Sequence, residues 1–342
     1  MSSAALVATA LVSPVGIGTR ATWAAVRGGI SHILDSAFIG ENGQPIRMAE
    51  VPDPCLPPLP EGIATGKTAR YRRMLRLCIA ALDQIDAPAS RPVPLFLGLP
   101  EKDASGQYPA LEPFLTEISR CFPGRLDLVS SRIYAEGRAS GFKALEAALD
   151  MLSRAGDEQT MVLVGGVDSY RDPLLLAHLD RAQRLLGGRG DGFIPGEGAG
   201  LLLLRKGSAA GTIQLTAAAN TAEPGHLLSD ELCHGDGLTQ AFAKTLAAAD
   251  QPVRTVFCGL NGENASGKEW GLAAVRLGGR LDPAFRLFHP ADCYGDLGAA
   301  SAPALWCLGA LGLAQGHLSG PLLSWCAADA APRGSALLLA PA

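Results

Sequence analysis

The chain has 342 residues, enough for two domains or for one large duplicated domain. Hydrophobic residues make up 48% of the chain and charged residues 18%, which predicts a large packed core and excludes a disordered protein. The net charge of −4 offers no basic surface for nucleic acid or for an anionic membrane.

The first residues and the cysteines indicate a cytoplasmic protein. The segment 1–12 is apolar, but it has no basic start and is too short to span a bilayer. The eight cysteines include no Cys-x-x-Cys pair, which argues against a zinc or thioredoxin-like site. Reduced thiols in the core are the simpler interpretation. We therefore expect no metal and no cofactor.

Strands and helices alternate in the predicted first half. In chain order we expect a strand at 4–11, a helix capped by Thr19 or Thr22 and ending at Val26, an irregular surface segment at 36–61, a helix at 68–85, a strand at 93–98, a helix at 110–121, an extended segment at 126–135, a helix at 139–155, a strand at 161–165 and a helix at 174–186. The arginines at the start of the helix 68–85 are expected to form a solvated, charged end.

The pattern restarts after a small polar stretch at 206–211. The second half is predicted to have strands at 213–219, 253–259, 322–327 and 335–339, and helices at 238–249, 268–277 and 299–313. Alternation of this kind gives mostly parallel mixed sheets covered by helices. We therefore predict an α/β protein with two duplicated halves, residues 1–206 and 211–342.

The most specific motif lies at residues 191–200, which read Asp-Gly-Phe-Ile-Pro-Gly-Glu-Gly-Ala-Gly and precede an apolar run at 201–204. A strand that ends in Gly165-Gly166 lies upstream of it. Together these features resemble the β-ketoacyl synthase branch of the thiolase superfamily, in which both are hallmarks. The resemblance implies the thiolase-like fold, with two pseudo-repeated halves in five αβαβα layers.

The resemblance also locates three catalytic positions, and none carries the expected side chain. The family's nucleophile lies in Thr-Ala-Cys-x-Ser-Gly, whereas residues 136–141 read Glu-Gly-Arg-Ala-Ser-Gly, so Arg138 takes the cysteine position. The two catalytic histidines are replaced by Asn261, after the strand at 255–259, and by Gly295, before Gly298-Ala299-Ala300. An arginine stays protonated and cannot attack a thioester.

A buried arginine at this position needs a partner, because an unpaired buried charge is costly. We expect Glu263 or Asp296, in the loops of the two lost histidines, to hold Arg138. The candidate binding residues are Ser140, Glu263, Asp296 and His226, although His226 is more simply interpreted as a surface histidine.

These replacements favour a non-catalytic protein that acts by binding, as a homodimer or as a heterodimer with a thiolase-fold protein. By resemblance it would be a partner or adaptor, either like a chain-length factor, which pairs with an active ketosynthase, or associated with a secretion effector. A secretion effector or an acyl carrier protein is a further possible partner, and neither nucleic acid nor a membrane span is expected. The family's dimer forms by strand pairing, which predicts an interface strand at 126–133.

Two alternatives stay open. One is an acyltransferase or condensing enzyme with relocated residues, such as Cys258 or a pair formed by Cys293 and His289. The other is a passive acyl-chain or CoA-binding module that uses the former tunnel.

Overall fold

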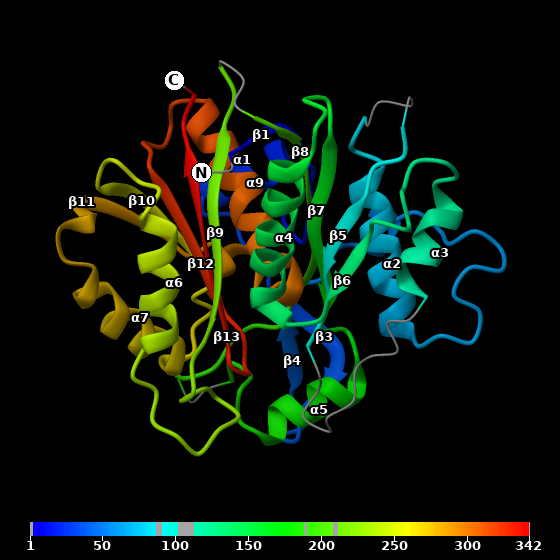
Figure 1. Cartoon of the computed structure of the whole chain (residues 1–342). Helices are drawn as coiled ribbons and strands as arrows, with labels where there is room; N and C mark the ends of the chain where they lie inside the picture. The colour runs from blue at the N-terminus through cyan, green and yellow to red at the C-terminus, as the bar shows by residue number, and fades with distance from the viewer. Residues whose placement is uncertain (1–2, 87–90, 102–112, 188–189, 208–210, 342) are drawn as a thin grey trace.

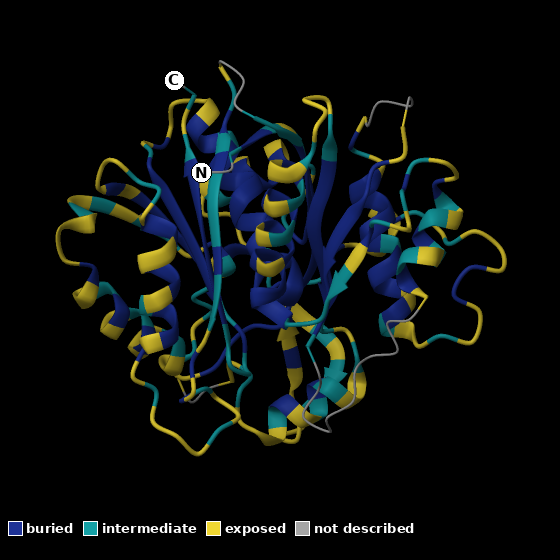
Figure 2. Cartoon of the chain, viewed as in Figure 1, coloured by how far each residue is buried: buried dark blue, intermediate teal, exposed yellow. Residues whose placement is uncertain are grey.

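Two β-sheets stand side by side, with helices between them and on both outer faces (Figure 1). The computed structural model describes residues 3–86, 91–101, 113–187, 190–207 and 211–341. No helix in these ranges is both long and apolar enough to cross a membrane. Figure 2 shows that the two sheets and the helices between them form the buried centre of the molecule.

The first sheet has six strands in the order β2-β1-β8-β7-β5-β6. Its strands are β1 (Ala4–Ser13), β2 (Gly16–Ile17), β5 (Leu95–Gly98), β6 (Arg132–Tyr134), β7 (Met161–Ser169) and β8 (Glu197–Lys206). Strand β5 runs parallel to both β6 and β7, whereas β8 is antiparallel to both β7 and β1. This order leaves β6 at one end of the sheet.

The second sheet has five strands in the order β11-β10-β12-β13-β9. They are β9 (Gln214–Ala222), β10 (Val253–Cys258), β11 (Leu281–Phe288), β12 (Leu322–Ala327) and β13 (Pro332–Leu339). Strand β10 is parallel to β11 and β12, and the other pairs are antiparallel. Antiparallel pairs are more frequent than the alternation of strands and helices predicts, because a short turn joins β12 to β13.

Five layers result, as the resemblance implies. The middle layer contains α4 (Ser140–Arg154) and α9 (Ser301–Ala314), with α1 (Thr19–Arg27) packed on α9. One outer layer has α2 (Ala69–Leu82) and α3 (Phe114–Cys121), and the other has α6 (Asp236–Leu246) and α7 (Asn264–Leu277). Helix α9 is apolar on all sides, which is the pattern of a helix enclosed by other elements.

Smaller elements gather at the end of the molecule where α4 and α9 begin (Figure 1). They are the antiparallel pair β3 (Leu34–Ile39) and β4 (Pro45–Met48), helices α5 (Pro173–Arg181) and α8 (Ala291–Tyr294), and the 3-10 helices η1 (Asp53–Cys55), η2 (Gly137–Ala139) and η4 (Gly298–Ala300). The 3-10 helix η3 (Gly278–Arg280) lies at the opposite end, where β10 and β11 begin. The prediction of an irregular segment at 36–61 was therefore wrong, since half of it forms this hairpin and η1.

Other sequence predictions need correction at element ends. Gly18, not a threonine, caps α1, and α5 stops at Arg181 because Gln183 turns the chain with φ of 59°. Strand β11 was missed, because its alternating exposure leaves few apolar residues in a row. Part of the predicted helix at 110–121 lies outside the described residues, and the described part forms α3. The division between residues 206 and 211 stays a prediction, although each large sheet takes all its strands from one side of it.

Of the four arginines at the start of α2, Arg72 is exposed as predicted, whereas the other three form ion pairs and do not belong to a solvated end. Arg73 is 5% exposed and lies 2.6 Å from the carboxylate of Glu197, which is fully buried in β8. Arg70 pairs with Asp168 at 3.0 Å, and Arg76 pairs with Asp53 at 2.7 Å. The pairs of Arg70 and Arg73 join α2 to β7 and β8 of the first sheet, and the pair of Arg76 joins it to η1.

The glycine motif brings β7 and β8 close to the middle layer. A Cβ atom at Gly166 would lie 2.1 Å from the backbone oxygen of Ala299, and one at Gly200 would lie 2.9 Å from Pro303. Only glycine permits these approaches. The motif therefore fixes the start of α9 against the sheet, and with it the site described next.

Candidate functional site

Arg138 lies at the start of the central helix α4, inside the 3-10 helix η2. It is buried, with 6% of its surface exposed. The hydroxyl of Ser140 donates a hydrogen bond of 2.6 Å to the backbone oxygen of Gly137 and so closes this turn. Gly98 allows the turn to lie against β5, since a Cβ there would meet Ser140 Oγ at 2.3 Å. Ser140 thus orients Arg138 within the fold.

Three carboxylates surround the Arg138 guanidinium. Its Nε lies 2.6 Å from Oδ2 of Asp296, and its Nη1 lies 2.6 Å from Oδ1 of Asp329. Glu263 is 3.8 Å from Nη2, too far for a hydrogen bond. These carboxylates raise the pKa of Arg138, against the opposing effect of burial. Both expected partners lie within ion-pair distance of Arg138, and Asp296 also accepts a hydrogen bond from it. The sequence analysis missed the third partner, Asp329.

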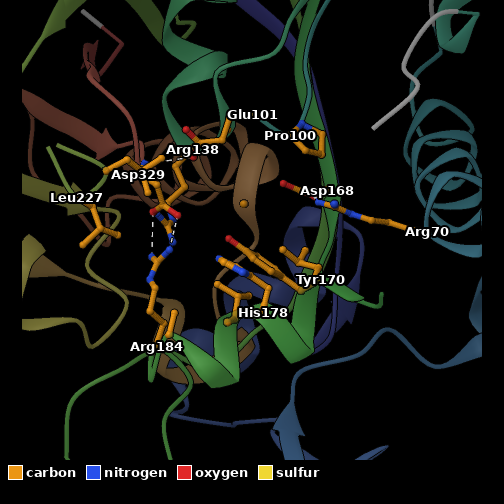
Figure 3. Close-up of a pocket in the computed structure, with 16 residues that line it drawn as sticks. Arg70, Pro100, Glu101, Arg138, Asp168, Tyr170, His178, Arg184, Leu227 and Asp329 are labelled. Carbon is orange, nitrogen blue, oxygen red and sulfur yellow. Dashed lines mark hydrogen bonds and ion pairs between the residues drawn. The ribbon is translucent and has the colours of Figure 1, made fainter. Parts of the chain in front are cut away.

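A second guanidinium completes the cluster. Arg184 donates to Glu263 at 2.8 and 3.0 Å and to Asp329 at 2.5 and 3.0 Å. Figure 3 shows Arg138 and Arg184 meeting at the Asp329 carboxylate. The Phe193 ring lies between the two arginines, 5.5 Å from one guanidinium carbon and 5.3 Å from the other. Two cations and three anions therefore share one partly enclosed site.

The three positions that the resemblance assigns to catalysis do converge. Asn261 donates from Nδ2 to Asp296 at 2.7 Å and to Glu263 at 3.1 Å. Gly295 contributes no side chain, and a Cβ there would lie 2.8 Å from the oxygen of Ile194 at a φ of 71°. Its neighbour Asp296 supplies the group that reaches Arg138. We refer to Arg138, Arg184, Asn261, Glu263, Asp296 and Asp329 as the arginine–carboxylate cluster.

Glu101 extends this cluster toward β5. Its carboxylate accepts hydrogen bonds from the backbone N–H groups of Asp329 and Ala330, at 3.1 and 3.2 Å. Burial, followed by the negative charge of Asp329, raises the pKa of Glu101. Burial acts on Asp329 in the same direction, but Arg138 and Arg184 outweigh it and lower the pKa of Asp329. Within this pair, Glu101 therefore binds a proton more readily than Asp329.

Two cavities open beside the cluster and share Arg138, Asp329 and Leu227. One of about 330 Å³ is lined by Glu101, Tyr170, His178 and Arg184, among others (Figure 3). The other, of about 800 Å³, includes His226. His226 Nδ1 accepts a hydrogen bond from Leu228 N–H at 3.2 Å, and no contact with the cluster is present among the described residues. His226 therefore lines a cavity without joining the cluster.

The cysteines near the cluster are not placed as nucleophiles. Cys258 donates from Sγ to the backbone oxygen of Phe288 at 3.2 Å, and burial raises its pKa to about 12. Burial also raises the pKa of Cys293. His289 directs its Nδ1 to Asp292 at 2.8 Å. Among the described residues, no cysteine hydrogen-bonds to a histidine.

One group of residues has the composition of a metal site. Glu223, Cys233 and Glu269 bring their ligand atoms within 4.8 Å of one another. However, Glu269 accepts from Arg333 Nε at 2.6 Å, and Glu223 accepts from Gly237 N–H at 2.7 Å at the start of α6. The carboxylates already have partners, so this group is explained as a structural cluster.

Comparison with known proteins finds ketosynthases, both by sequence and by structure. Residues 137–210 match the family model for the beta-ketoacyl synthase N-terminal domain. The polyketide synthase ThaQ of Burkholderia thailandensis is 39% identical over 76 residues. That match covers 20% of this chain and only 4% of ThaQ, so the chain spans a small fraction of that curated relative.

Solved structures resemble the whole chain. The complex described as AntDE:AntF, a type II polyketide synthase acyl-carrier protein with its ketosynthase bound to the hexaketide, matches with a TM-score of 0.75 at 13% identity. That match covers 98% of this chain and 99% of the other. The ketosynthase ApeO in complex with its chain length factor ApeC from Xenorhabdus doucetiae also matches, with a TM-score of 0.75 at 14% identity over 99% and 98% of the two chains.

Residues 137–210 are therefore similar to the N-terminal domain of β-ketoacyl synthases, and the chain as a whole has the thiolase-like fold of the ketosynthase structures. The family match begins at Gly137, so the matched segment contains Arg138, Ser140 and the glycine motif. Arg184, Asp329 and Glu101 escaped the sequence analysis. Asp329 is a single acid in an apolar stretch at 326–332, and such an isolated charge is the one signal that could have indicated it.

Proposed function

We propose that this ketosynthase-like chain is non-catalytic and acts by binding a second thiolase-fold protein, either its own copy or a relative. The observation that carries the proposal is the Arg138 guanidinium, held by Asp296 and Asp329 at the start of α4. A protonated guanidinium has no lone pair for attack on a thioester. Carboxylates beside it would destabilise the oxyanion of an acyl-transfer step, which needs hydrogen-bond donors or positive charge.

The buried thiols support the same proposal. A nucleophilic cysteine needs a lowered pKa and access to its substrate. Cys258 has neither, since it is buried and its pKa is raised. A relocated cysteine–histidine pair therefore has no support in the geometry around Cys258 and Cys293.

The free edge of the first sheet supports a partner-binding role. Tyr134 of β6 accepts from Leu99 N–H at 2.8 Å, so it faces β5. Because neighbouring strand residues face opposite sides, Ile133 directs its N–H and C=O groups away from the sheet. Within the described residues no strand pairs with this side of β6, and such an edge is a template for strand addition.

The turn before β6 adds an apolar contact. Val129 is 86% exposed and Leu128 is 39% exposed. The predicted interface strand at 126–133 is therefore corrected: only Arg132 and Ile133 of that segment belong to β6, and residues 128–130 form a turn. We infer that β6 pairs with its counterpart in the partner, while Val129 packs at the border.

Native mass spectrometry and size-exclusion chromatography with light scattering test this proposal. The variant Val129→Asp should weaken the dimer at least tenfold, because it places a second acid near Asp127 inside the contact. Val275→Asp is the matched control, since Val275 is 83% exposed on α7, in the other half of the molecule.

If the chain alone is monomeric, affinity capture from its source cell identifies the partner. A captured thiolase-fold protein that is lost with Val129→Asp and retained with Val275→Asp supports the proposal. A chain that is monomeric at micromolar concentration and captures no thiolase-fold protein contradicts it.

A further inference from the structure

A separate pocket of about 330 Å³ lies at the far end of α9 from the arginine–carboxylate cluster. Helix α9 begins next to Gly298, which lines the cluster cavity, and His317 follows its other end. A helix of 14 residues spans about 20 Å, at ~1.5 Å per residue. The pocket is lined by Trp23, Val26, Arg27, Arg286, Phe288, His317 and Leu318. It shares no residue with the cavities at Arg138.

Its lining carries positive charge without an acidic residue. Arg27 comes from the end of α1, Arg286 from β11, and His317 from the loop after α9. Both arginines contact His317: Arg27 Nη1 lies 3.2 Å from its ring nitrogens, and Arg286 Nη1 donates to its backbone oxygen at 3.4 Å. Among the described residues, neither arginine has a carboxylate within ion-pair distance.

Aromatic rings hold the two guanidinium groups in place. The Arg27 guanidinium lies 5.8 Å from the centre of the Trp23 ring, and that of Arg286 lies 4.8 Å from the centre of the Phe288 ring. A guanidinium above an aromatic ring is attracted to the face of that ring and can still donate from the N–H groups at its edge. The Nε1–H of Trp23 is buried and has no hydrogen-bond partner among the described residues, so the pocket also borders an unused donor.

This arrangement fits a doubly charged oxyanion. Like charges held together repel one another, and a bound anion removes that repulsion. Guanidinium groups bind phosphate oxygens with two parallel hydrogen bonds. The volume admits a small organic group in addition to the phosphate, since ligand pockets of roughly 300 Å³ hold small molecules.

We propose that this pocket binds the phosphate group of a small phosphorylated molecule. The proposal does not depend on the function proposed above, because it uses other residues and another end of the molecule. Inorganic phosphate and a nucleoside monophosphate share the required chemistry, and the experiment separates them.

Isothermal titration calorimetry at constant ionic strength provides the test, with inorganic phosphate, adenosine monophosphate and acetate as probes. Phosphate should bind saturably and at least tenfold more tightly than acetate. The double variant Arg27→Gln/Arg286→Gln should lower phosphate affinity at least tenfold. Arg20→Gln is the matched control, because Arg20 is exposed on the same helix but does not line the pocket, and it should change affinity less than twofold.

Adenosine monophosphate binding at least tenfold more tightly than phosphate would identify a nucleotide as the ligand class, and equal affinities would show that only the phosphate is recognised. Saturable binding that is no tighter for phosphate than for acetate would overturn the proposal. Equal weakening by Arg20→Gln and by the double variant would overturn it as well, since general surface charge would then explain the affinity.

Discussion

The Nε atom of Arg138 lies 2.6 Å from Oδ2 of Asp296, and this contact joins residues 158 positions apart. It connects the turn before α4 to the loop before α9, and therefore joins the starts of the two central helices. In a protein with the fold of ketosynthases, an ion pair occupies the place where the resemblance expects a thiol and imidazoles. The consequences of this replacement can be measured.

Arg138→Met should lower the free energy of unfolding by about 3–5 kcal/mol, the usual cost of leaving a buried charge without its partner. The loss should shrink in Arg138→Met/Asp296→Asn, because the second change removes one of the uncompensated carboxylates. Urea denaturation monitored by circular dichroism measures both values. Arg181→Ala, which breaks an exposed pair with Glu41, is the control and should change stability little. Equal losses in the single and double variants would contradict the pairing.

Glu101 should make the protein less stable as the pH rises toward neutral. Its pKa is raised in the folded state, so the folded protein holds a proton that the unfolded chain has already released. The stability that this group contributes is complete below its unfolded pKa and is lost as the pH rises through its folded pKa. Glu101→Gln should therefore flatten the profile of urea midpoints above the ordinary pKa of a glutamate. Parallel profiles for the variant and the natural chain would show that Glu101 does not titrate in this range.

Asp329 should act in the opposite direction. Its pKa is lowered because Arg138 and Arg184 outweigh burial, so it contributes stability above its unfolded pKa. That contribution should be lost as the pH falls below about 4, where the unfolded carboxylate becomes protonated. Asp329→Asn should therefore cost stability at neutral pH and progressively less in acid. Thermal unfolding at pH 7 and pH 3 measures the difference, and an equal cost at both values would contradict this assignment.

Restoring the cysteine alone should not restore a reactive thiol. In Arg138→Cys the new side chain would face Asp296, Asp329 and Glu263, and neighbouring negative charge disfavours a thiolate. Alkylation by iodoacetamide at pH 7, followed by peptide mass spectrometry, measures its rate against exposed Cys55 in the same sample. We expect Cys55 to react faster. A faster reaction at position 138 would mean that the start of α4 still activates a nucleophile despite the carboxylates.

Gly166, in the glycine pair of β7, tests whether the close approach of the sheet to α9 positions the site. Gly166→Ala would place a methyl group 2.1 Å from the oxygen of Ala299, so the start of α9 must shift. The expected cost is about 1–3 kcal/mol, as for other overpacked cores. Gly156→Ala is the control, because no atom lies within 4 Å of the added Cβ. A Gly166→Ala variant as stable as the control would show that the close approach is not required.

The sequence predicts the layers of this fold better than it predicts which side chains form the arginine–carboxylate cluster. Apolar runs such as 201–204 and the fully apolar α9 indicate buried elements directly, because burial depends on composition. The family resemblance located the motif positions Arg138, Asn261 and Gly295, because the glycines around them are retained. The β3–β4 hairpin and β11 were missed, because their exposed residues alternate with few apolar ones.

Most of the site contacts that could not be predicted from the sequence are polar contacts between residues far apart in the chain. Arg73 and Arg70 look solvated in the sequence, since their partners Glu197 and Asp168 lie about a hundred positions away or more. Asp329 and Arg184 are 145 positions apart, and nothing local in either segment indicates the other. Ion pairs of this kind follow from the fold and cannot be read from periodicity.

The central claim is that the Arg138 site does not form an acyl-enzyme. Intact-protein mass spectrometry after incubation with acyl-CoA and with a malonyl thioester tests it most directly, with an active ketosynthase as the positive control. We predict an unchanged mass for this chain and no decarboxylated product. A stable acyl adduct on Cys258 or Cys293, or detectable decarboxylation, would contradict the account.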